Sequence, residues 1–256
     1  MNKIEVVSDN VILNDVKDSI TTYSDNGILI INCKKDSEVL LINNVYKEIV
    51  IEVSNDVVLN ILEIKNDSNN ILNYKYILND NSKAIINKFY YLNKYNENID
   101  INLNGYASDV IFNLSVASFD NQKYNINVYH NNKKTVSNIF NHGVTFDNSS
   151  IDFTINGTIK KGMKDSILNQ DNKIMVMGNG KSVINPNLFV DDDLIEARHG
   201  ASIGKFSEDE IFYLETRGIP RDIGYQLLMK GFLLNTLVVN VETLKELETI
   251  VEKLRR

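Results

Sequence analysis

The stretch Asp109-VIFNLSVASFDNQKYNINVY-His130 holds the pattern from which the rest of this chain can be interpreted. Two apolar runs, at 109–118 and 122–130, are separated by a short polar turn, and polar and apolar residues alternate through much of the second. A period of two is typical of β-strands with one buried face, because successive side chains point to opposite sides of a strand. The stretch therefore predicts two short strands joined by a tight connection.

The same pattern extends in both directions, from Ile4 to about Ile203. Short apolar runs, separated by Asn, Asp, Ser and Gly, recur roughly every ten to thirteen residues, the strand-plus-turn spacing of all-β folds. Further runs lie at 27–33, 48–54, 57–65 and 71–78. A sandwich, a barrel and a solenoid all fit this spacing. Only two prolines and turns rich in Asn and Gly favour a solenoid, in which short rungs stack into one core.

The pattern changes to a helical one after Phe206. Ser207-Glu-Asp-Glu210 is a capping-box sequence, and it predicts a helix start just before an apolar segment. Gly218 is suited to end that helix and Pro220 to begin the next. A third helix is indicated by one apolar stripe, formed by Val241, Leu244, Leu247, Val251 and Leu254. We therefore divide the chain into a β-helix core, 1–206, and a compact C-terminal helical region, 207–256.

Composition narrows the class of function. The chain has 256 residues with 27 Lys and Arg against 34 Asp and Glu, and this net charge of −7 disfavours binding to nucleic acid. No apolar stretch has the length of a signal peptide or a membrane span, so a cytoplasmic protein without a membrane partner is expected. The single cysteine, Cys33, lies in an apolar run and is interpreted as a small buried hydrophobic residue.

No catalytic signature is present, and we expect a protein that is not an enzyme. The segment Gly178-Asn-Gly-Lys-Ser182 lacks the spacing of a phosphate-binding loop, and no helical pattern follows it. Binding of a nucleotide by this chain is therefore not expected. His130 and His142 could face the same side of stacked rungs, but neither has a partner at metal-ligand spacing, and a local hydrogen bond is the simpler role.

A dense set of residues between Asn185 and Leu233 resembles the C-terminal signature of the SufB/SufD family. The matching positions are Pro186, Leu188, Val190, Asp192, His199-Gly200-Ala201, Gly204, Phe212-Tyr213, Arg217-Gly218-Ile219 and Gly231-Phe232. A weaker likeness upstream involves His130, Thr135, Ser137 and Asn156-Gly157. The resemblance covers roughly residues 120–235. It implies a right-handed parallel β-helix followed by helices that dock on the SufC ATPase.

The sequence also departs from the family pattern. Strand-like sequence begins almost at Ile4, where the family usually has a helical region. No cysteine is present at 168–176, where SufB-type members typically carry one, and His199-Gly200 matches the SufD type better. These features favour a SufD-like or minimal-system subunit, and they argue against a chain that holds a cluster with its own thiolates.

The resemblance implies a site around His199, near the contact between two such subunits. A neutral imidazole there could bind iron in a nascent cluster, with Glu196 and Asp192 as oxygen ligands. The alternatives are a structural histidine in a turn and solvated acidic corner residues at 191–193. Arg217, Gly218, Ile219 and Phe232 are the expected partner-binding residues, although the first three also fit plain helix-capping geometry.

The leading hypothesis is a non-catalytic scaffold subunit of the SUF iron–sulfur cluster assembly system. Such a subunit would bind a SufC-type ABC ATPase, pair with itself or with a SufB-like subunit, and carry a transient iron–sulfur cluster or iron at the interface. ATP-driven motion would remodel that interface. Two alternatives remain: a polysaccharide-active β-helix enzyme, which would need a row of carboxylates along one face, and a purely structural β-helix oligomer.

Overall fold

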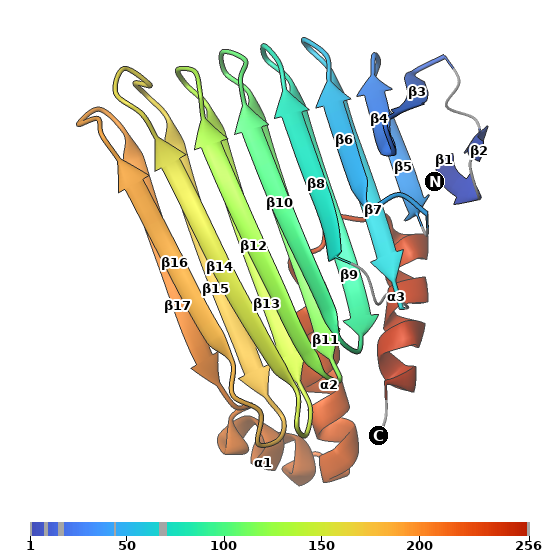
Figure 1. Ribbon diagram of the computed structural model, residues 1–256. Coiled ribbons are helices and arrows are strands. Elements are labelled where there is room, and N and C mark those ends of the chain that lie inside the picture. The colour runs from blue at the N-terminus through green and yellow to red at the C-terminus, as the bar shows by residue number, and fades with distance from the viewer. Residues whose placement is uncertain (1, 8–9, 15–17, 44, 67–70, 255–256) are drawn as a thin grey trace.

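The computed structural model describes residues 2–7, 10–14, 18–43, 45–66 and 71–254. This part of the chain is mainly β-strand, 56%, and forms a parallel β-solenoid of about six turns with three α-helices (Figure 1). The predicted β-helix is therefore confirmed. Met1 and Arg255–Arg256, at the outer ends of the two predicted regions, lie outside the described residues.

The strands alternate between two sheets, so each turn of the solenoid adds one strand to each. The nine-stranded sheet has the order β17-β15-β13-β11-β9-β7-β5-β1-β2. Its strands are β1 (Asn2–Val7), β2 (Asn10–Asn14), β5 (Ser37–Asn43), β7 (Val58–Lys65), β9 (Lys83–Leu92), β11 (Asp109–Ser118), β13 (Val136–Thr145), β15 (Ile167–Val176) and β17 (Glu196–Gly204).

The eight-stranded sheet lies opposite and has the order β16-β14-β12-β10-β8-β6-β4-β3. Its strands are β3 (Ile20–Asp25), β4 (Ile28–Cys33), β6 (Glu48–Val53), β8 (Ile71–Leu78), β10 (Tyr95–Leu103), β12 (Asn121–His130), β14 (Ser150–Ile159) and β16 (Val183–Val190). The two strands predicted at 109–130 are thus β11 and β12, which lie in different sheets.

Side-chain hydrogen bonds between stacked turns show the length of one turn. Asn98 bonds to Asn73 and Asn113 to Asn87, over 25 and 26 residues, whereas Asn187 bonds to Asn156 over 31. Corners need left-handed backbone, which Asn and Asp tolerate better than other non-glycine residues. Among the described non-glycine residues, positive φ occurs at Asn26, Asp56, Asn81, Ala107, Lys134, Asn148 and Asp165. Three of these seven residues are Asn and two are Asp, the types that tolerate this backbone conformation.

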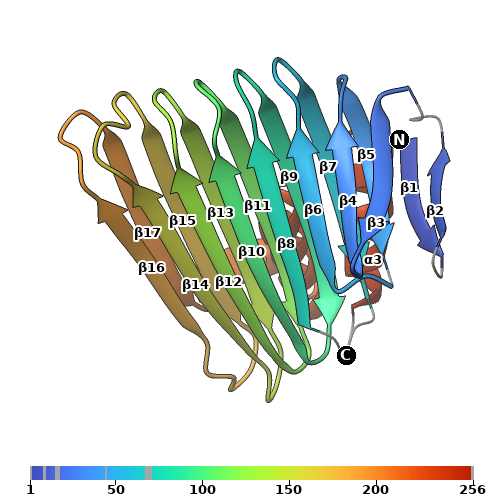
Figure 2. The same ribbon diagram turned by 45° about the horizontal axis from the view of Figure 1, so that its top comes forward.

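The two ends of the solenoid differ (Figures 1 and 2). At the N-terminal end the parallel pattern stops, because β2 pairs antiparallel with β1, and β3 antiparallel with β4. At the C-terminal end the parallel ladders continue to β16 and β17, which are the last strands in their sheets. Apolar side chains fill the space between the sheets, and Cys33 is among them, with a thiol whose pKa burial raises to about 12.

Three helices follow β17: α1 (Glu208–Thr216), α2 (Arg221–Leu234) and α3 (Val241–Lys253). Ser207 caps α1 by accepting a hydrogen bond from the Asp209 N–H, which confirms the predicted start. Gly218, with a φ of +81°, ends α1: its N–H bonds to Glu215 O and the Ile219 N–H to Leu214 O. This is a Schellman motif, as the glycine predicts.

Helices α2 and α3 cover the outer face of the nine-stranded sheet (Figure 2). Their buried apolar residues form one cluster with residues on the sheet; it includes Phe89, Ala117, Val144, Met229, Leu233, Leu247 and Val251. The predicted stripe of α3 is wrong at its first position, because Val241 is 68% exposed at the start of the helix. Within the described residues, no helix has the length and apolar character needed to cross a membrane.

Candidate functional site at the open end of the solenoid

The last turn of the solenoid presents two strand edges and several apolar side chains to solvent. In the strand order, β16 and β17 each have a neighbour on one side, so one row of backbone groups on each strand faces outward along the solenoid axis. Exposed apolar residues gather on these strands and on the corner between them: Val183, Phe189, Val190, Leu194 and Ile203. An exposed edge with apolar side chains is a surface suited to strand pairing.

His199 lies on the interior side of this last turn. It is in register with Gln170 of β15, and stacked parallel strands carry paired residues on the same face. Gln170 is buried and points across the solenoid, where its Nε2 lies 3.4 Å from Asn187 O of β16. A Cβ on Gly157 would lie 3.0 Å from that same Nε2, so the glycine leaves room for the amide. His199 itself is exposed, because no turn stacks above it.

The acidic residues predicted beside His199 are placed differently. Glu196 is separated from His199 by three positions on β17, so the two side chains point to opposite faces, and Glu196 pairs with Arg198 at 3.1 Å. The Asp192 carboxylate accepts the Gly162 N–H at 2.7 Å and the Leu194 N–H at 3.0 Å. These backbone hydrogen bonds lower the pKa of Asp192, which therefore shapes the corner before β17.

Among the residues that the structure describes, no three His, Cys, Asp or Glu side chains gather closely enough to hold a metal ion. His199 is thus a single nitrogen donor at an exposed strand edge.

The other two histidines do not share a face, contrary to the possibility raised by their spacing. His130 points into the solenoid from β12, where its Nδ1 and Nε2 lie 2.7 and 2.8 Å from the hydroxyls of Thr135 and Ser137. This local bonding confirms the simpler role for His130. His142 is on β13, in the other sheet, and its ring stacks on Phe232 of α2 with centroids 4.5 Å apart.

Helix α1 presents the exposed part of the helical region. Phe212 and Tyr213 are 66% and 57% exposed, and the Arg217 guanidinium lies over the Tyr213 ring, 5.1 Å from its centroid. Arg217 and Gly218 are exposed at the end of α1, and Ile219 is half-buried. Phe232, also predicted to bind a partner, is half-buried, and its ring packs against His142.

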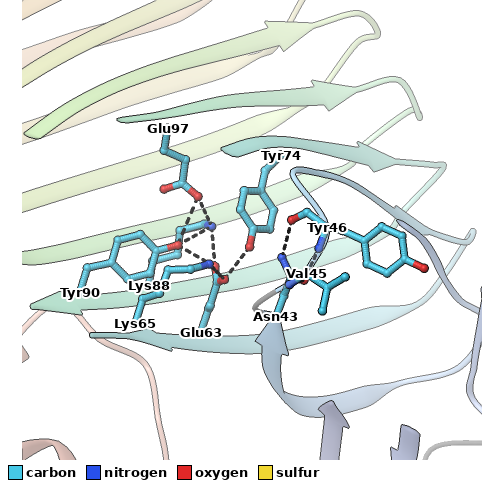
Figure 3. A network of polar contacts seen from close by, with 9 residues as sticks. All are labelled: Asn43, Val45, Tyr46, Glu63, Lys65, Tyr74, Lys88, Tyr90 and Glu97. Atoms are coloured by element: carbon cyan, nitrogen blue, oxygen red, sulfur yellow. Dashed lines mark hydrogen bonds and ion pairs between the residues drawn. The ribbon is translucent and has the colours of Figure 1, made fainter. Parts of the chain in front are cut away.

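A buried ionic cluster, which the sequence analysis missed, lies between the two sheets (Figure 3). It consists of Glu63, Lys65, Tyr74, Lys88, Tyr90 and Glu97, from strands β7 to β10. Lys88 Nζ bridges the carboxylates of Glu63 and Glu97, at 2.8 and 2.9 Å. The signal was present, because Glu63 and Lys65 follow Leu59 and Ile61 in the inward phase of β7.

The charges in this cluster stabilise one another. Burial opposes ionisation of Glu63, but the ammonium groups of Lys65 and Lys88 outweigh it and hold the pKa of Glu63 well below its usual range. Burial would also lower the pKa of Lys88, yet Glu63 and Glu97 raise it above its usual range. Burial raises the pKa of Glu97. With two carboxylates and two ammonium groups, the cluster fixes strands in register rather than presenting a free charge to a ligand.

Comparison with known proteins shows which family this sequence is similar to. Residues 24–232 match the sequence model of a family described as "SUF system FeS cluster assembly, SufBD core domain". The iron–sulfur cluster assembly protein SufD of Bacillus subtilis is 29% identical over 113 residues, which are 44% of this chain and 26% of that protein.

Two further relatives match shorter segments. SufBD family proteins of iron–sulfur cluster assembly from Mycobacterium leprae and Pyrococcus horikoshii are 35% and 39% identical over 63 and 61 residues. These segments are 24% and 23% of this chain and 16% and 14% of those proteins. The chain thus matches about a quarter or less of the length of each of these relatives.

Proposed function

Because this chain belongs to the SufBD family of the SUF system, we propose that it is a scaffold subunit of iron–sulfur cluster assembly and not an enzyme. The family match over 24–232 carries the proposal. The open last turn and the exposed face of α1 give the scaffold two separate surfaces. In this proposal the open turn pairs with another subunit, and the helical region, 207–256, docks an ATPase.

The pairing partner is a second β-helix subunit, either another copy of this chain or a SufB-like protein. The exposed edges of β16 and β17 support this assignment, because a second edge would satisfy their outward backbone groups and cover the apolar side chains around them. A subunit of the same fold offers an edge of matching twist and spacing.

His199 supplies a nitrogen ligand to iron or to a cluster at this interface. Its exposure at the end of an interior row supports the role, and the lack of two neighbouring donors among the described residues is consistent with a site that two chains complete. Cluster and iron are cargo in this scheme, held while the two subunits stay paired. Glu196 lies on the other face of β17 and joins the site only through the partner, whereas Asp192 holds the corner.

The ATPase is of the SufC type and binds α1. Phe212, Tyr213 and Arg217 offer exposed apolar and cationic groups close together, which is the composition enriched at protein interfaces. Gly218 and Ile219 fix the end of this surface, whereas Phe232 packs against His142 and Phe206. ATP-driven movement of the bound ATPase then changes the contact at the open turn.

Co-purification with the SufC-type ATPase of the same organism tests this proposal. The unmodified chain is expected to form a stable complex, and either Tyr213→Glu or Arg217→Glu to weaken it by about tenfold or more, as for hot-spot residues. Tyr106→Glu is the matched control, since Tyr106 is an exposed tyrosine on a corner of the solenoid. Lack of association with the unmodified chain would overturn the ATPase assignment and leave a structural oligomer.

A further inference from the structure

The C-terminal end of α2 is held by side chains of the nine-stranded sheet. The last four carbonyl groups of a helix have no partner within the helix and must find one elsewhere. In α2 these belong to Gly231, Phe232, Leu233 and Leu234. The first and last accept the N–H groups of Asn235 and Leu237, at 3.1 and 3.2 Å, in the turn that follows.

The two middle carbonyls are bonded by the solenoid itself. His142 Nδ1 lies 2.9 Å from Phe232 O, and because a carbonyl only accepts, this nitrogen must carry the proton. The Ser115 hydroxyl donates to Leu233 O at 2.5 Å. Ser115 and His142 are register partners on β11 and β13, so two neighbouring strands present two donors side by side to one helix end.

A third attachment follows directly along the chain. The Asn87 side chain on β9 donates to Val238 O at 3.0 Å and accepts the Val238 N–H at 2.9 Å. It thus pairs with the backbone of Val238 as a neighbouring strand would. Asn113 on β11 donates to the same Asn87 oxygen at 2.9 Å and braces it. Ser115, Asn87 and His142 are all buried, so these bonds are shielded from water.

Apolar packing alone would leave α2 free to slide, because dispersion and burial are not directional. The hydrogen bonds to the carbonyl groups of Phe232 and Leu233 fix both the position of α2 on the sheet and its rotation about its own axis. The loss of either donor would leave a buried carbonyl without a partner, which costs more than the bond itself contributes.

We infer that Asn87, Ser115 and His142 form a polar latch that makes the helical region and strands β9, β11 and β13 one mechanical unit. This inference rests on the proposed function: force from an ATPase on α1 reaches the solenoid through α2 and its latch. The three residues are positioning residues, and none of them contacts cargo.

The combined variant Ser115→Ala, His142→Phe tests the latch, since phenylalanine keeps a ring to stack on Phe232 but removes the donor. Hydrogen exchange followed by mass spectrometry should show faster exchange of α2 and α3 amides, by about tenfold or more, with β10 and β12 unchanged. When His142→Asn takes the place of His142→Phe in the combined variant, an N–H remains near the Nδ1 position. Much of the protection of α2 and α3 from hydrogen exchange should then return. Lys173→Gln is the matched control, because Lys173 is the register neighbour of His142 and pairs with Asp171.

Equal exchange in the combined variant and in Lys173→Gln would overturn the latch. If the combined variant does not fold, the same comparison is made with His142→Phe alone. The latch variant should still bind the ATPase, because α1 is unaltered. With a spin label attached at Lys123→Cys on each of two paired subunits, nucleotide should change the distance between the labels in the unmodified complex but not in the latch variant. A failure of the unmodified chain to bind the ATPase would count against the proposed function, whereas the exchange result would still decide the latch.

Discussion

His130 is held neutral by its surroundings. Burial lowers its pKa to about 4, and both ring nitrogens are bonded to hydroxyls, which serve a neutral imidazole as well as a charged one. The folded-state pKa therefore lies below the unfolded value of about 6.5. Stability from this group is fully present above about pH 6.5 and is lost as the pH falls towards 4.

Acid should therefore destabilise the protein partly through this residue. The unfolding free energy should fall between pH 6.5 and pH 4, and we expect this fall to be smaller in His130→Gln than in the unmodified protein. The difference is up to about 3 kcal/mol for a pKa shift from about 6.5 to about 4. Urea denaturation at a series of pH values measures the effect. His199→Gln, at an exposed histidine, should leave the pH dependence in place. An unchanged pH slope in His130→Gln would show that His130 is not the titrating group.

Single residues were predictable where one local rule governs them. Gly218 and Ser207 followed from helix-end geometry, and Cys33 followed from an apolar run. His199 was identified by resemblance, which names the residues of a segment but not the side of the strand on which each one lies. In β17 the alternation of side chains places His199 and Glu196 on opposite faces.

At the scale of elements, the ionic cluster joins strands of both sheets. Glu63 and Lys65 pair within β7, whereas Lys88 of β9 pairs both with Glu63 of the neighbouring strand and with Glu97 of β10 in the opposite sheet. A buried charge that loses its partner is costly, even where the whole group contributes little net stability.

Lys88→Met should accordingly lower the unfolding free energy by about 3–5 kcal/mol, because it leaves Glu63 and Glu97 buried without their shared cation. Lys173→Met, at a half-exposed lysine that pairs with Asp171, should change it by less than about 1 kcal/mol. Urea denaturation at pH 7 compares the two. A small effect in both variants would show that water enters the cluster and replaces the lost ammonium group.

Strand positions followed from the alternation of residues, but sheet membership did not. The runs at 109–118 and 122–130 were expected as successive strands, and their assignment to opposite sheets depends on partners 25 to 31 residues away. A local pattern carries no information about such partners. The same limit explains why the complete cluster was missed: the alternation marks Glu63 and Lys65 as inward residues, but Lys88 and Glu97, which complete it, are distant in sequence.

For the whole molecule, the difference between its two ends predicts which end pairs in the proposed assembly. The N-terminal end finishes in the antiparallel edge strands β2 and β3, whereas β16 and β17 extend the parallel ladders, which a second parallel β-helix can continue. Association should therefore occur through the C-terminal end.

Ile203→Lys tests this polarity by placing a charge at the exposed edge, on a residue that is 47% exposed and lies on the interior row with Ile174. We expect loss of the paired form, measured by sedimentation of this chain alone and with a SufB-like subunit. Tyr23→Lys, on the edge strand β3 at the other end, should leave pairing intact. Loss of pairing only in Tyr23→Lys would reverse the orientation of the complex.

The burial of Cys33 has a consequence for the supply of sulfur. Only a thiolate attacks a sulfur donor, and this thiol is fully enclosed with a pKa of about 12. It is also the one cysteine in the 256 residues. In the proposed scaffold, Cys33 therefore offers no thiolate on which sulfur could arrive or be stored, and a second copy of this chain would offer none either. Pairing with a SufB-like subunit would divide the work: the partner accepts sulfur, and this chain shapes the place where it meets iron.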